Sequence, residues 1–453
     1  MTSPLALDVV ADAGLEILAL DSLDLGRAAA ETGATLVHVD DYATPDVRSS
    51  LAPVDVLLSS MEDGSFGRRP ADLVIDSTIG AEDAERPVDG SGVVLLGIEY
   101  APMRPQVRQA AERRRSAPPV PDASGVHCVV VMGGTDAVGA AAVVTGVCGL
   151  SSRIARCTVV APEERWAAIR KAGRGLSLEL LLPFPGLLDL ASRADVVISA
   201  AGTTAWELAC IGVPTALVAV VDNQVDGYEV AVARGIGAPL GLLADLERSP
   251  EQAASVLDEM IMTSSSRTAP SRLDGLGASR IVDAWEELLA SAWADVGPRS
   301  VIEVRPAVSA DAAVLLRWRN DPVTRTVSRT TDRVRWSDHV AWLERVLASP
   351  ERLLLVAESD GRRVGTVRFD ALDGGCWEVS ITLAPEVRGR GLAARVLEAA
   401  ESAFSALRGQ HDIVATILPE NRSSQAVFRR RGYVLMERGQ DSFDVLVKRA
   451  EVR

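Results

Sequence analysis

Short apolar runs, separated by polar or glycine-rich turns and by helical stretches, fill the first two thirds of the chain. Residues 126–132 (VHCVVVM) and 195–201 (DVVISAA) are examples, and each leads directly into a glycine turn. Apolar runs of about four to eight residues bounded by turn residues are typical of strands buried on both faces of a parallel sheet. The pattern predicts an α/β fold with strands at 15–20, 35–40, 54–58, 73–76, 93–97, 126–132, 156–160, 178–182, 195–201 and 213–219.

A different pattern begins after the linker at 295–300. Residues 378–383 (EVSITL) carry β-branched side chains at alternate positions, which predicts a strand with one buried face. The apolar stretches on either side of Asp360-Gly361 predict a hairpin. Since helices and antiparallel strands are mixed here, this part is predicted to be a separate α+β domain.

Composition marks the boundaries between the units. The Pro-rich stretch at 117–121 separates the first strands from the strand at 126–132. An amphipathic helix at 279–293 precedes the linker, with apolar side chains at helical spacing. We therefore predict three domains, at residues 1–121, 122–295 and 300–453.

Charge is unevenly distributed over the 453 residues, whose net charge is −15. Residues 300–453 hold 24 Lys and Arg against 21 Asp and Glu, or +3, so the remainder carries −18. An acidic body argues against general nucleic-acid binding. The basic excess in the last domain suits a phosphate-bearing small molecule.

The sequence also bears on cellular location and metals. No apolar run approaches the roughly 20 residues that span a bilayer, and no secretion signal follows Met1. The five cysteines are scattered and the four histidines lack ligand spacing. We therefore expect a cytoplasmic enzyme with buried, reduced cysteines, no metal and no membrane partner, and we leave its oligomeric state open.

The segment Arg388-Gly-Arg-Gly-Leu-Ala393, which we call the cradle, joins strand 378–383 to a helix that begins at about Leu392. Glycines at a helix start let a phosphate approach backbone N–H groups that have no partner within the helix. Arg388 and Arg390 add positive charge, so the cradle predicts a pyrophosphate site. It lacks the spacings of the P-loop and of the dinucleotide fingerprint. The alternative is a surface turn with solvated arginines.

The cradle matches the Arg/Gln-x-x-Gly-x-Gly/Ala signature of the GNAT acetyltransferases. Residues 421–433 (NRSSQAVFRRRGY) resemble the next motif of that family, Asn-x-x-Ala/Ser followed by a helix that ends in Gly-Phe/Tyr. The resemblance implies a domain that binds acetyl-CoA as acetyl donor. The implied cofactor-binding residues are Leu383, Arg388, Gly389, Arg390, Gly391, Leu392, Ala393 and Asn421.

In this family an amine attacks the thioester directly, so positioning supplies much of the rate. A backbone N–H near Ser380–Leu383 is expected to polarise the carbonyl. Glu378 is the candidate for the base that takes the amine proton, although a plain surface glutamate is equally consistent. Phe428 stands where the family often has a tyrosine that protonates the leaving thiolate. Tyr433, Ser424 or water is expected to serve instead, unless the thiolate leaves unaided.

Two further glycine turns follow strands in the middle of the chain, Gly133-Gly-Thr-Asp136 and Gly202-Thr-Thr204. Small residues give a ligand access, hydroxyls and amides donate hydrogen bonds, and the carboxylate of Glu207 can accept from sugar hydroxyls. Each turn alone is also consistent with a structural turn. Together they favour a site for a phosphate or its ribose.

With Asp222-Asn-Gln224, these turns look like the nucleotide-sugar half of the UDP-sugar hydrolases of pseudaminic acid biosynthesis, relatives of the GT-B glycosyltransferases and of spore-coat polysaccharide proteins. The resemblance implies a GT-B-like pair of Rossmann-type domains before the GNAT domain. That family opens with a Gly-x-Gly-His turn carrying the proposed catalytic His, which is missing here: either the recorded start is late, or this half only binds. The implied UDP-binding residues are Gly133, Gly134, Thr135, Asp136, Gly202, Thr203, Thr204, Glu207, Asn223 and Gln224.

Residues 317–320 (RWRN) and His339 resemble the amino-sugar N-acetyltransferases of the same pathway. That resemblance implies that Arg319, Asn320 and His339 bind the acceptor. A helical face with a capping Asn is equally consistent. A second helix is predicted from Ser337, with Ser337 as its N-cap.

Three functions remain open. The favoured one is an acetyl-CoA-dependent N-acetyltransferase, fused to a UDP-sugar hydrolase-like module, that acts on a UDP-amino-dideoxy sugar in nonulosonic acid or surface polysaccharide synthesis. In the second, the acceptor is a protein or small-molecule amine and the first half is a non-catalytic nucleotide-sugar-binding module. In the third, the first half is an inactive scaffold for a partner enzyme.

Overall fold

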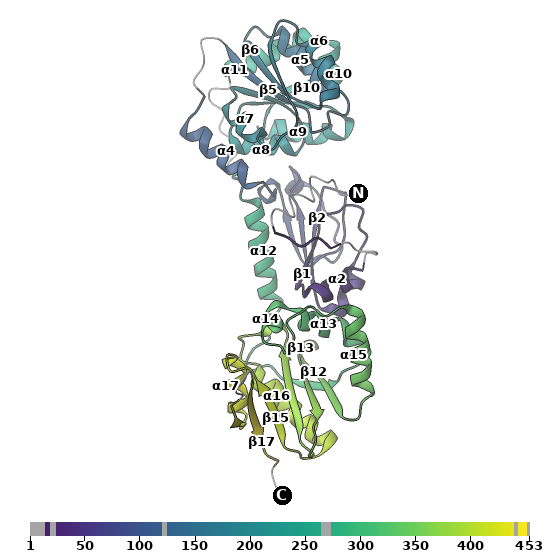
Figure 1. The fold of residues 1–453 in the computed structure, drawn as a ribbon. Coiled ribbons are helices and arrows are strands. Elements are labelled where there is room, and N and C mark those ends of the chain that lie inside the picture. Colours follow the sequence, from purple (N-terminus) through teal and green to yellow (C-terminus); the bar gives the residue numbers. More distant parts are fainter. Residues whose placement is uncertain (1–13, 19–23, 120–124, 264–272, 439–442, 451–453) are drawn as a thin grey trace.

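The computed structural model describes residues 14–18, 24–119, 125–263, 273–438 and 443–450. These residues form three lobes in a row, with the N-terminal strands in the middle (Figure 1). We call them the first lobe (residues 24–100), the Rossmann lobe (residues 105–263) and the transferase lobe (residues 303–448). All three contain helices and sheets, so the predicted mixed α/β fold is confirmed.

The first lobe contains a four-stranded parallel sheet in the order β1-β2-β3-β4. The strand expected at 54–58 starts later, because Pro53 lies in a 3-10 turn at Ala52–Val54. Residues 14–18 are not a strand, and the rest of the run expected at 15–20 lies outside the described residues. The elements are α2 (Leu25–Thr32), β1 (Leu36–Val39), α3 (Arg48–Leu51), β2 (Leu57–Glu62), β3 (Leu73–Asp76) and β4 (Val93–Leu96).

The Rossmann lobe is a doubly wound parallel sheet in the order β10-β9-β8-β5-β6-β7. The chain reverses direction across the sheet between β5 and β8, where open α/β sheets bind ligands. Its strands are β5 (Val126–Val131), β6 (Ile154–Val160), β7 (Ser177–Leu181), β8 (Val196–Ala200), β9 (Thr215–Ala219) and β10 (Ala238–Leu242). Its helices are α5 (Ala140–Leu150), α6 (Trp166–Ala172), α7 (Leu187–Arg193), α8 (Thr203–Ile211), α9 (Val225–Ala233), α10 (Leu243–Arg248) and α11 (Pro250–Thr263).

Two helices pack against the domain on the other side of the boundary predicted at 121/122. Helix α4 (Pro105–Ser116) precedes the boundary but packs on α7 and α8 of the Rossmann lobe, where its Val107 and Ala110 are fully buried. Helix α12 (Gly277–Ser291) follows the Rossmann lobe but packs on the first lobe, where Ile281 lies in one apolar cluster with Met61 of β2. In Figure 1, α12 runs along the first lobe toward the transferase lobe.

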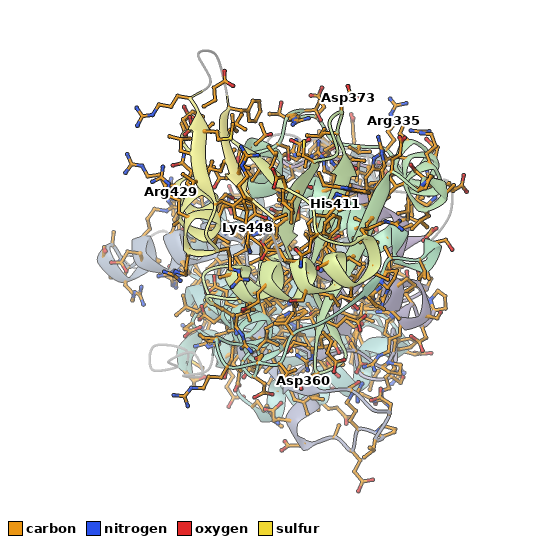
Figure 2. The ribbon with its side chains drawn as sticks, turned by 90° about the horizontal axis from the view of Figure 1, so that it is seen from below. Arg335, Asp360, Asp373, His411, Arg429 and Lys448 are labelled. Atoms are coloured by element: carbon orange, nitrogen blue, oxygen red, sulfur yellow. The ribbon has the colours of Figure 1, made fainter. Side chains whose placement is uncertain are left out.

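The transferase lobe has a seven-stranded sheet in the order β11-β12-β13-β14-β15-β17-β16. Asp360 and Asp373, in the turns at either end of β13, lie on opposite sides of the lobe (Figure 2). The strands are β11 (Glu303–Pro306), β12 (Arg352–Ser359), β13 (Arg362–Ala371), β14 (Trp377–Leu383), β15 (Ile413–Ile417), β16 (Val434–Glu437) and β17 (Asp444–Lys448). The helices are α13 (Ala312–Asn320), α14 (Pro322–Thr326), α15 (Trp336–Ala348), α16 (Ala393–Arg408) and α17 (Arg422–Arg430).

The first lobe and the transferase lobe share an apolar core. Leu316 of α13 is fully buried in the cluster that contains Ala30 of α2 and Val39 of β1. Asn320 donates a hydrogen bond from Nδ2 to the carbonyl of Glu31 at 3.1 Å. Helix α13 is therefore held between the core of its own lobe and the first lobe.

One predicted cap is corrected. Helix α15 begins at Trp336, before Ser337, and its N-cap is Arg335, which makes no side-chain capping bond. Ser337 is already inside the helix, because the tryptophan before it packs against the apolar core.

Candidate acetyl-CoA and acceptor sites

The cradle is a turn with two glycines in the left-handed region, immediately before α16. Gly389 has φ 74° and Gly391 has φ 76°. Side chains disfavour these angles, which explains why glycine stands at both positions. A Cβ at Gly389 would meet no atom within 4 Å, so the backbone there is open to a ligand. Open N–H groups at the start of a 16-residue helix suit the pyrophosphate of acetyl-CoA.

Both arginines of the cradle are hydrogen-bonded within the protein. Arg388 donates to Asp321 Oδ1 and to Thr324 Oγ1, each at 2.6 Å. Burial alone would raise the pKa of Asp321, but the hydrogen bonds from Arg388 and Thr324 hold it below its ordinary value. Arg390 donates to the carbonyl of Trp293, just after α12. Both arginines therefore fix the position of the cradle, and the backbone N–H groups remain its free donors.

Strands β14 and β15 diverge next to the cradle. Among the described strands they pair at only two positions, Trp377 with Ile413 and Glu378 with Val414. β14 stays paired with β13 on its other side up to Leu383. The edge of β14 from Val379 onward therefore faces β15 without a ladder, which leaves backbone groups for an extended, amide-bearing ligand such as the arm of CoA.

Glu378 lies on the same face of β14 as Ser380 and Thr382, because side chains alternate along a strand. Its carboxylate accepts from Arg329 Nη2 at 2.6 Å and its side chain is 19% exposed. Ser380 and Thr382 line a cavity described below. Glu378 is thus near the cavity but already paired with a cation.

Tyr433 and Ser424, the two residues expected to protonate the leaving thiolate, lie in different environments. Tyr433 is 2% exposed and its hydroxyl donates to Glu401 Oε1 at 2.9 Å. Burial and the Glu401 carboxylate raise the pKa of Tyr433 above its ordinary value, so this hydroxyl is a poor acid. Ser424 is half-buried in the first turn of α17 and its backbone N–H donates to Asn421 Oδ1. The Asn421 side chain is therefore the N-cap of α17.

A cavity of about 330 Å³ lies between helices α13 and α15 and the sheet. Three of its lining residues each carry a buried polar atom that has no hydrogen-bond partner among the described residues: Trp318 Nε1, Arg319 Nη1 and His339 Nε2. Burial lowers the pKa of His339 to about 4, so its ring is neutral at physiological pH. The lining residues are Leu315, Trp318, Arg319, Thr330, Val334, His339, Trp342, Leu354, Thr366, Arg368, Ser380 and Thr382.

Two of the three expected acceptor residues, Arg319 and His339, line this cavity, but Asn320 does not. Asn320 is fully buried, and besides its bond to Glu31 it exchanges hydrogen bonds with the backbone of Val334, each at 2.8 Å. Its amide therefore joins the two lobes. No local pattern pointed to Trp342 of α15 or Arg368 of β13, which line the cavity from separate elements.

The two glycine turns of the Rossmann lobe meet at one edge of its sheet. Gly133 and Gly134 follow β5, Gly202 follows β8, and these strands are neighbours. A Cβ at any of the three glycines would have no atom within 4 Å. Asp136 has φ 41° and is 2% exposed, and burial raises the pKa of its carboxyl. Thr135 lies in the first turn, and Thr203 and Thr204 open α8.

Two residues expected to bind UDP are engaged within the protein. Glu207 accepts from Arg104 Nε at 2.9 Å and from Arg104 Nη2 at 2.8 Å. Gln224 Oε1 accepts from the backbone N–H of Val220 at 3.1 Å. Asn223 lies with Gln224 in the 3-10 turn Asp222–Gln224, after β9. Since β9 neighbours β8, this turn lies at the same sheet edge as Gly202.

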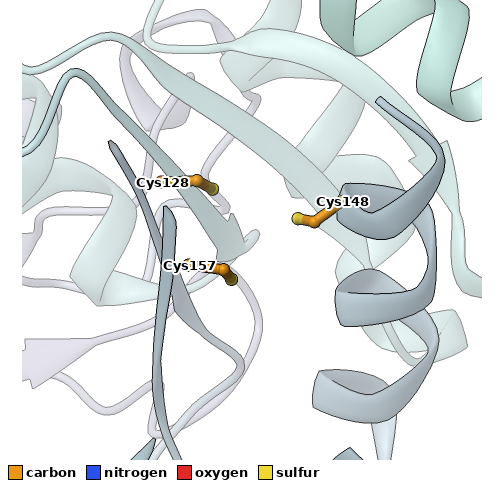
Figure 3. Close-up of side chains that lie close together, drawn as sticks. All are labelled: Cys128, Cys148 and Cys157. Atoms are coloured by element: carbon orange, nitrogen blue, oxygen red, sulfur yellow. The ribbon is translucent and has the colours of Figure 1, made fainter. Parts of the chain in front are cut away.

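Three cysteines that looked scattered in the sequence lie together. Cys128 of β5, Cys148 of α5 and Cys157 of β6 are fully buried, and their Sγ atoms lie within 4.8 Å of one another (Figure 3). Cys128 and Cys157 are direct partners across neighbouring strands. Thiolates are ligands of soft metals, but the cluster is packed within the apolar core of the lobe. Small buried hydrophobes remain the simpler interpretation.

Among the helices that the structure describes, none has both the length and the apolar character needed to cross a bilayer.

A family model described as an acetyltransferase (GNAT) domain matches residues 302–434. No curated protein matches the chain. A solved structure similar to it is N-acetyltransferase PseH of Campylobacter jejuni in complex with acetyl coenzyme A, with 12% identity, 33% of this chain, 99% of that chain and a TM-score of 0.26. An N-acetyltransferase from Staphylococcus aureus Mu50 is 20% identical over 33% of this chain and 96% of that chain, with a TM-score of 0.28. A domain from Methanocaldococcus jannaschii is 18% identical over 33% of this chain and 98% of that chain, with a TM-score of 0.30.

The family model spans the cradle, the diverging strands and every residue that lines the cavity. The C-terminal part of the chain is a GNAT acetyltransferase domain, and the chain is an N-acetyltransferase.

Proposed function

We propose that the chain transfers the acetyl group of acetyl-CoA to the amine of a nucleotide-linked amino-dideoxy sugar, in the synthesis of a nonulosonic acid or a surface polysaccharide. The observation that carries this proposal is the presence on one chain of a GNAT domain and of a Rossmann lobe with two open glycine turns at its switch point. The first supplies N-acetylation, and the second suits a nucleotide diphosphate.

In the transferase lobe, the backbone of Gly389–Ala393 would hold the pyrophosphate of acetyl-CoA, and β14 up to Leu383 would hold its arm. Acetyl-CoA supplies an activated acyl group when bound. Among this chain's own residues, a backbone N–H of β14 would polarise the carbonyl. Glu378 remains the proposed base. Its carboxylate must first release Arg329, which donates a hydrogen bond to it, before it can accept the amine proton. Ser424 or water remains the proposed acid, because Tyr433 is bonded to Glu401.

In the Rossmann lobe, we assign the nucleotide diphosphate to the turns Gly133–Asp136 and Gly202–Thr204. Asn223 and Gln224 would border it. Glu207 would contact the ribose only if Arg104 released it. Hydrolysis of the nucleotide sugar is not part of this proposal.

A specific observation keeps the second function open. The Rossmann lobe and the transferase lobe lie on opposite sides of the first lobe (Figure 1). A sugar bound at one site therefore does not reach the other without dissociating. This arrangement also fits a Rossmann lobe that senses a nucleotide sugar while the transferase lobe acetylates a protein or small-molecule amine.

Mass spectrometry of the products separates these functions. The full chain is mixed with acetyl-CoA and a UDP-4-amino-4,6-dideoxy sugar. We expect the acetylated UDP-sugar and no free UDP. Acetylated sugar together with free UDP would mean that the Rossmann lobe hydrolyses after all. Acetylation of a peptide amine but not of the sugar nucleotide would contradict the proposal and favour the second function. A chain that UDP does not protect against thermal unfolding would favour the scaffold.

A further inference from the structure

Arg319 and Arg325 are two neighbouring cations without a counter-ion. Arg319 lines the cavity, and both arginines donate to the loop between α14 and α15, Arg319 to the carbonyl of Thr330 at 2.7 Å and Arg325 to that of Thr331 at 3.0 Å. Within the described part of the chain, no carboxylate pairs with either one. Burial and the positive charge of Arg325 lower the pKa of Arg319. The pair is therefore held together at an electrostatic cost that an anion would relieve.

The donors around this pair are also unsatisfied. Arg319 Nη1 and Arg325 Nε are buried atoms with no partner among the described residues. Trp318 Nε1 is in the same state, and the Trp318 side chain is 1% exposed. Buried donors without a partner are rare, because each costs the free energy of its lost hydration. Trp318 and Arg319 line the cavity and Arg325 does not, so two of these donors belong to its wall, and a ligand with acceptor oxygens that enters there would complete them.

The charge of the cavity selects the kind of acceptor. Its lining includes Arg319 and Arg368, and no acidic side chain among the described residues. Arg368 forms an ion pair with Asp370 at 2.8 Å. Arg319 is therefore the positively charged lining residue that has no carboxylate partner among the described residues. A polycationic amine would be repelled here, whereas an amine that also carries an oxyanion would be attracted.

We propose that this cavity is an oxyanion subsite, in which Arg319, supported by Arg325 and the indole N–H of Trp318, binds a phosphate group of the acceptor while its amine is directed toward Ser380 and Thr382 of β14. The proposal deepens the proposed function and rests on it for the reaction, but the anion site can be tested without any acceptor amine. Diphosphate is the chemistry that a sugar nucleotide would present.

The test is titration calorimetry of inorganic pyrophosphate into the full chain saturated with CoA, so that the cradle is already filled. In Arg319→Gln we expect one binding event to weaken roughly 10- to 100-fold, the effect of losing one charge-assisted hydrogen-bond donor group. Arg319→Lys keeps the charge but loses the planar fork, and should lie between Arg319→Gln and the unmodified chain.

The matched control is Arg335→Gln. This change also removes one positive charge, ten residues beyond Arg325, but from an exposed side chain at the periphery of the lobe (Figure 2). It should change pyrophosphate affinity less than about 2-fold, because exposed charges are screened. Pyrophosphate that binds to the Rossmann lobe contributes equally to the titration of every variant, so it does not affect the comparison between them.

Two results would overturn the proposal. Unchanged pyrophosphate binding in Arg319→Gln, with folding checked by thermal unfolding, would show that the cavity holds no anion. A loss of CoA affinity in that variant would assign the arginine pair to the acetyl donor instead. If pyrophosphate binding behaves as expected but the UDP-amino sugar is not acetylated, the subsite stands and the acceptor is another anionic amine.

Discussion

At the scale of single residues, the cradle depends on the left-handed conformation of Gly389. Gly389→Ala should cost about 1 to 2 kcal/mol, because Cβ approaches the following carbonyl oxygen at this φ. The chain can avoid that strain by changing the turn, which would misdirect the N–H groups. We therefore expect both a lower midpoint of unfolding and weaker acetyl-CoA binding, measured by calorimetry.

Gly374→Ala is the matched control for this prediction. Gly374 has φ 85° and open space at its Cβ position, but lies in the turn between β13 and β14. It should lower stability similarly and leave acetyl-CoA affinity unchanged. Equal losses of affinity in both variants would mean that the cradle backbone is not the binding element.

His339 predicts how stability depends on pH. Its pKa is about 4 in the folded chain, lowered by burial, and 6.5 is its ordinary value. Between these values the unfolded chain binds the proton and the folded chain does not, so stability falls as pH falls from 6.5 to 4. The full difference corresponds to about 3 kcal/mol.

His339→Gln should remove this contribution. The free energy of unfolding is measured in urea at pH 7 and at pH 4.5. Between these two values it should fall by about 2 kcal/mol less in the variant than in the unmodified chain. His411→Gln, which changes a half-buried histidine of the same lobe (Figure 2), is the control. An unchanged pH dependence in His339→Gln would mean that the imidazole is accessible to water.

At the scale of elements, α13 is joined to the segment before the cradle by a buried ion pair. Arg317 is fully buried and pairs with Glu386, whose side chain is 6% exposed. Glu386 lies in the 3-10 turn Pro385–Val387. Arg317→Met should cost about 3 to 5 kcal/mol of unfolding free energy, because it leaves a buried carboxylate unpaired.

The double variant Arg317→Met/Glu386→Leu should recover most of that stability, since neither charge then needs solvation. Denaturant unfolding of the two single variants and the double variant measures the coupling. Additive losses would mean that the two side chains do not interact. Because Glu386 precedes the cradle, Arg317→Met should also weaken acetyl-CoA binding, and the double variant should restore it only in part.

The sequence predicted elements better than it predicted what they bring together. β5 and β8 were placed correctly because both of their faces are buried and their apolar runs are continuous. β10 was missed, since Pro239 and Gly241 interrupt its pattern at a bulge. The bond from Arg388 to Asp321 joins residues 67 positions apart, which no local pattern reveals. The cradle glycines were predictable because their conformation is local; the cavity was not, because it depends on packing.

At the scale of the whole molecule, the first lobe shares an apolar cluster with each of its neighbours. Its contact with the transferase lobe is the core that includes Leu316. Its contact with the Rossmann lobe is a buried cluster in which Ile79 and Ile98 lie with Leu217 of β9, together with ion pairs from Arg234 to Glu82 and Asp83. An apolar interface between domains couples their unfolding more strongly than a polar one.

We therefore expect a single unfolding transition in calorimetry for the three lobes. UDP at about 100 times its dissociation constant should stabilise this transition by about 2.7 kcal/mol. Leu316→Asp, which places a carboxylate in the core at the far end of the first lobe, should lower the same transition, while Val323→Asp at a 60% exposed position of α14 should leave it unchanged. Two transitions, of which UDP shifts one and Leu316→Asp the other, would contradict this and mean that the Rossmann lobe unfolds independently. In one cooperative unit, nucleotide binding at one end reaches the acetyltransferase site through α13, the helix that carries Arg319.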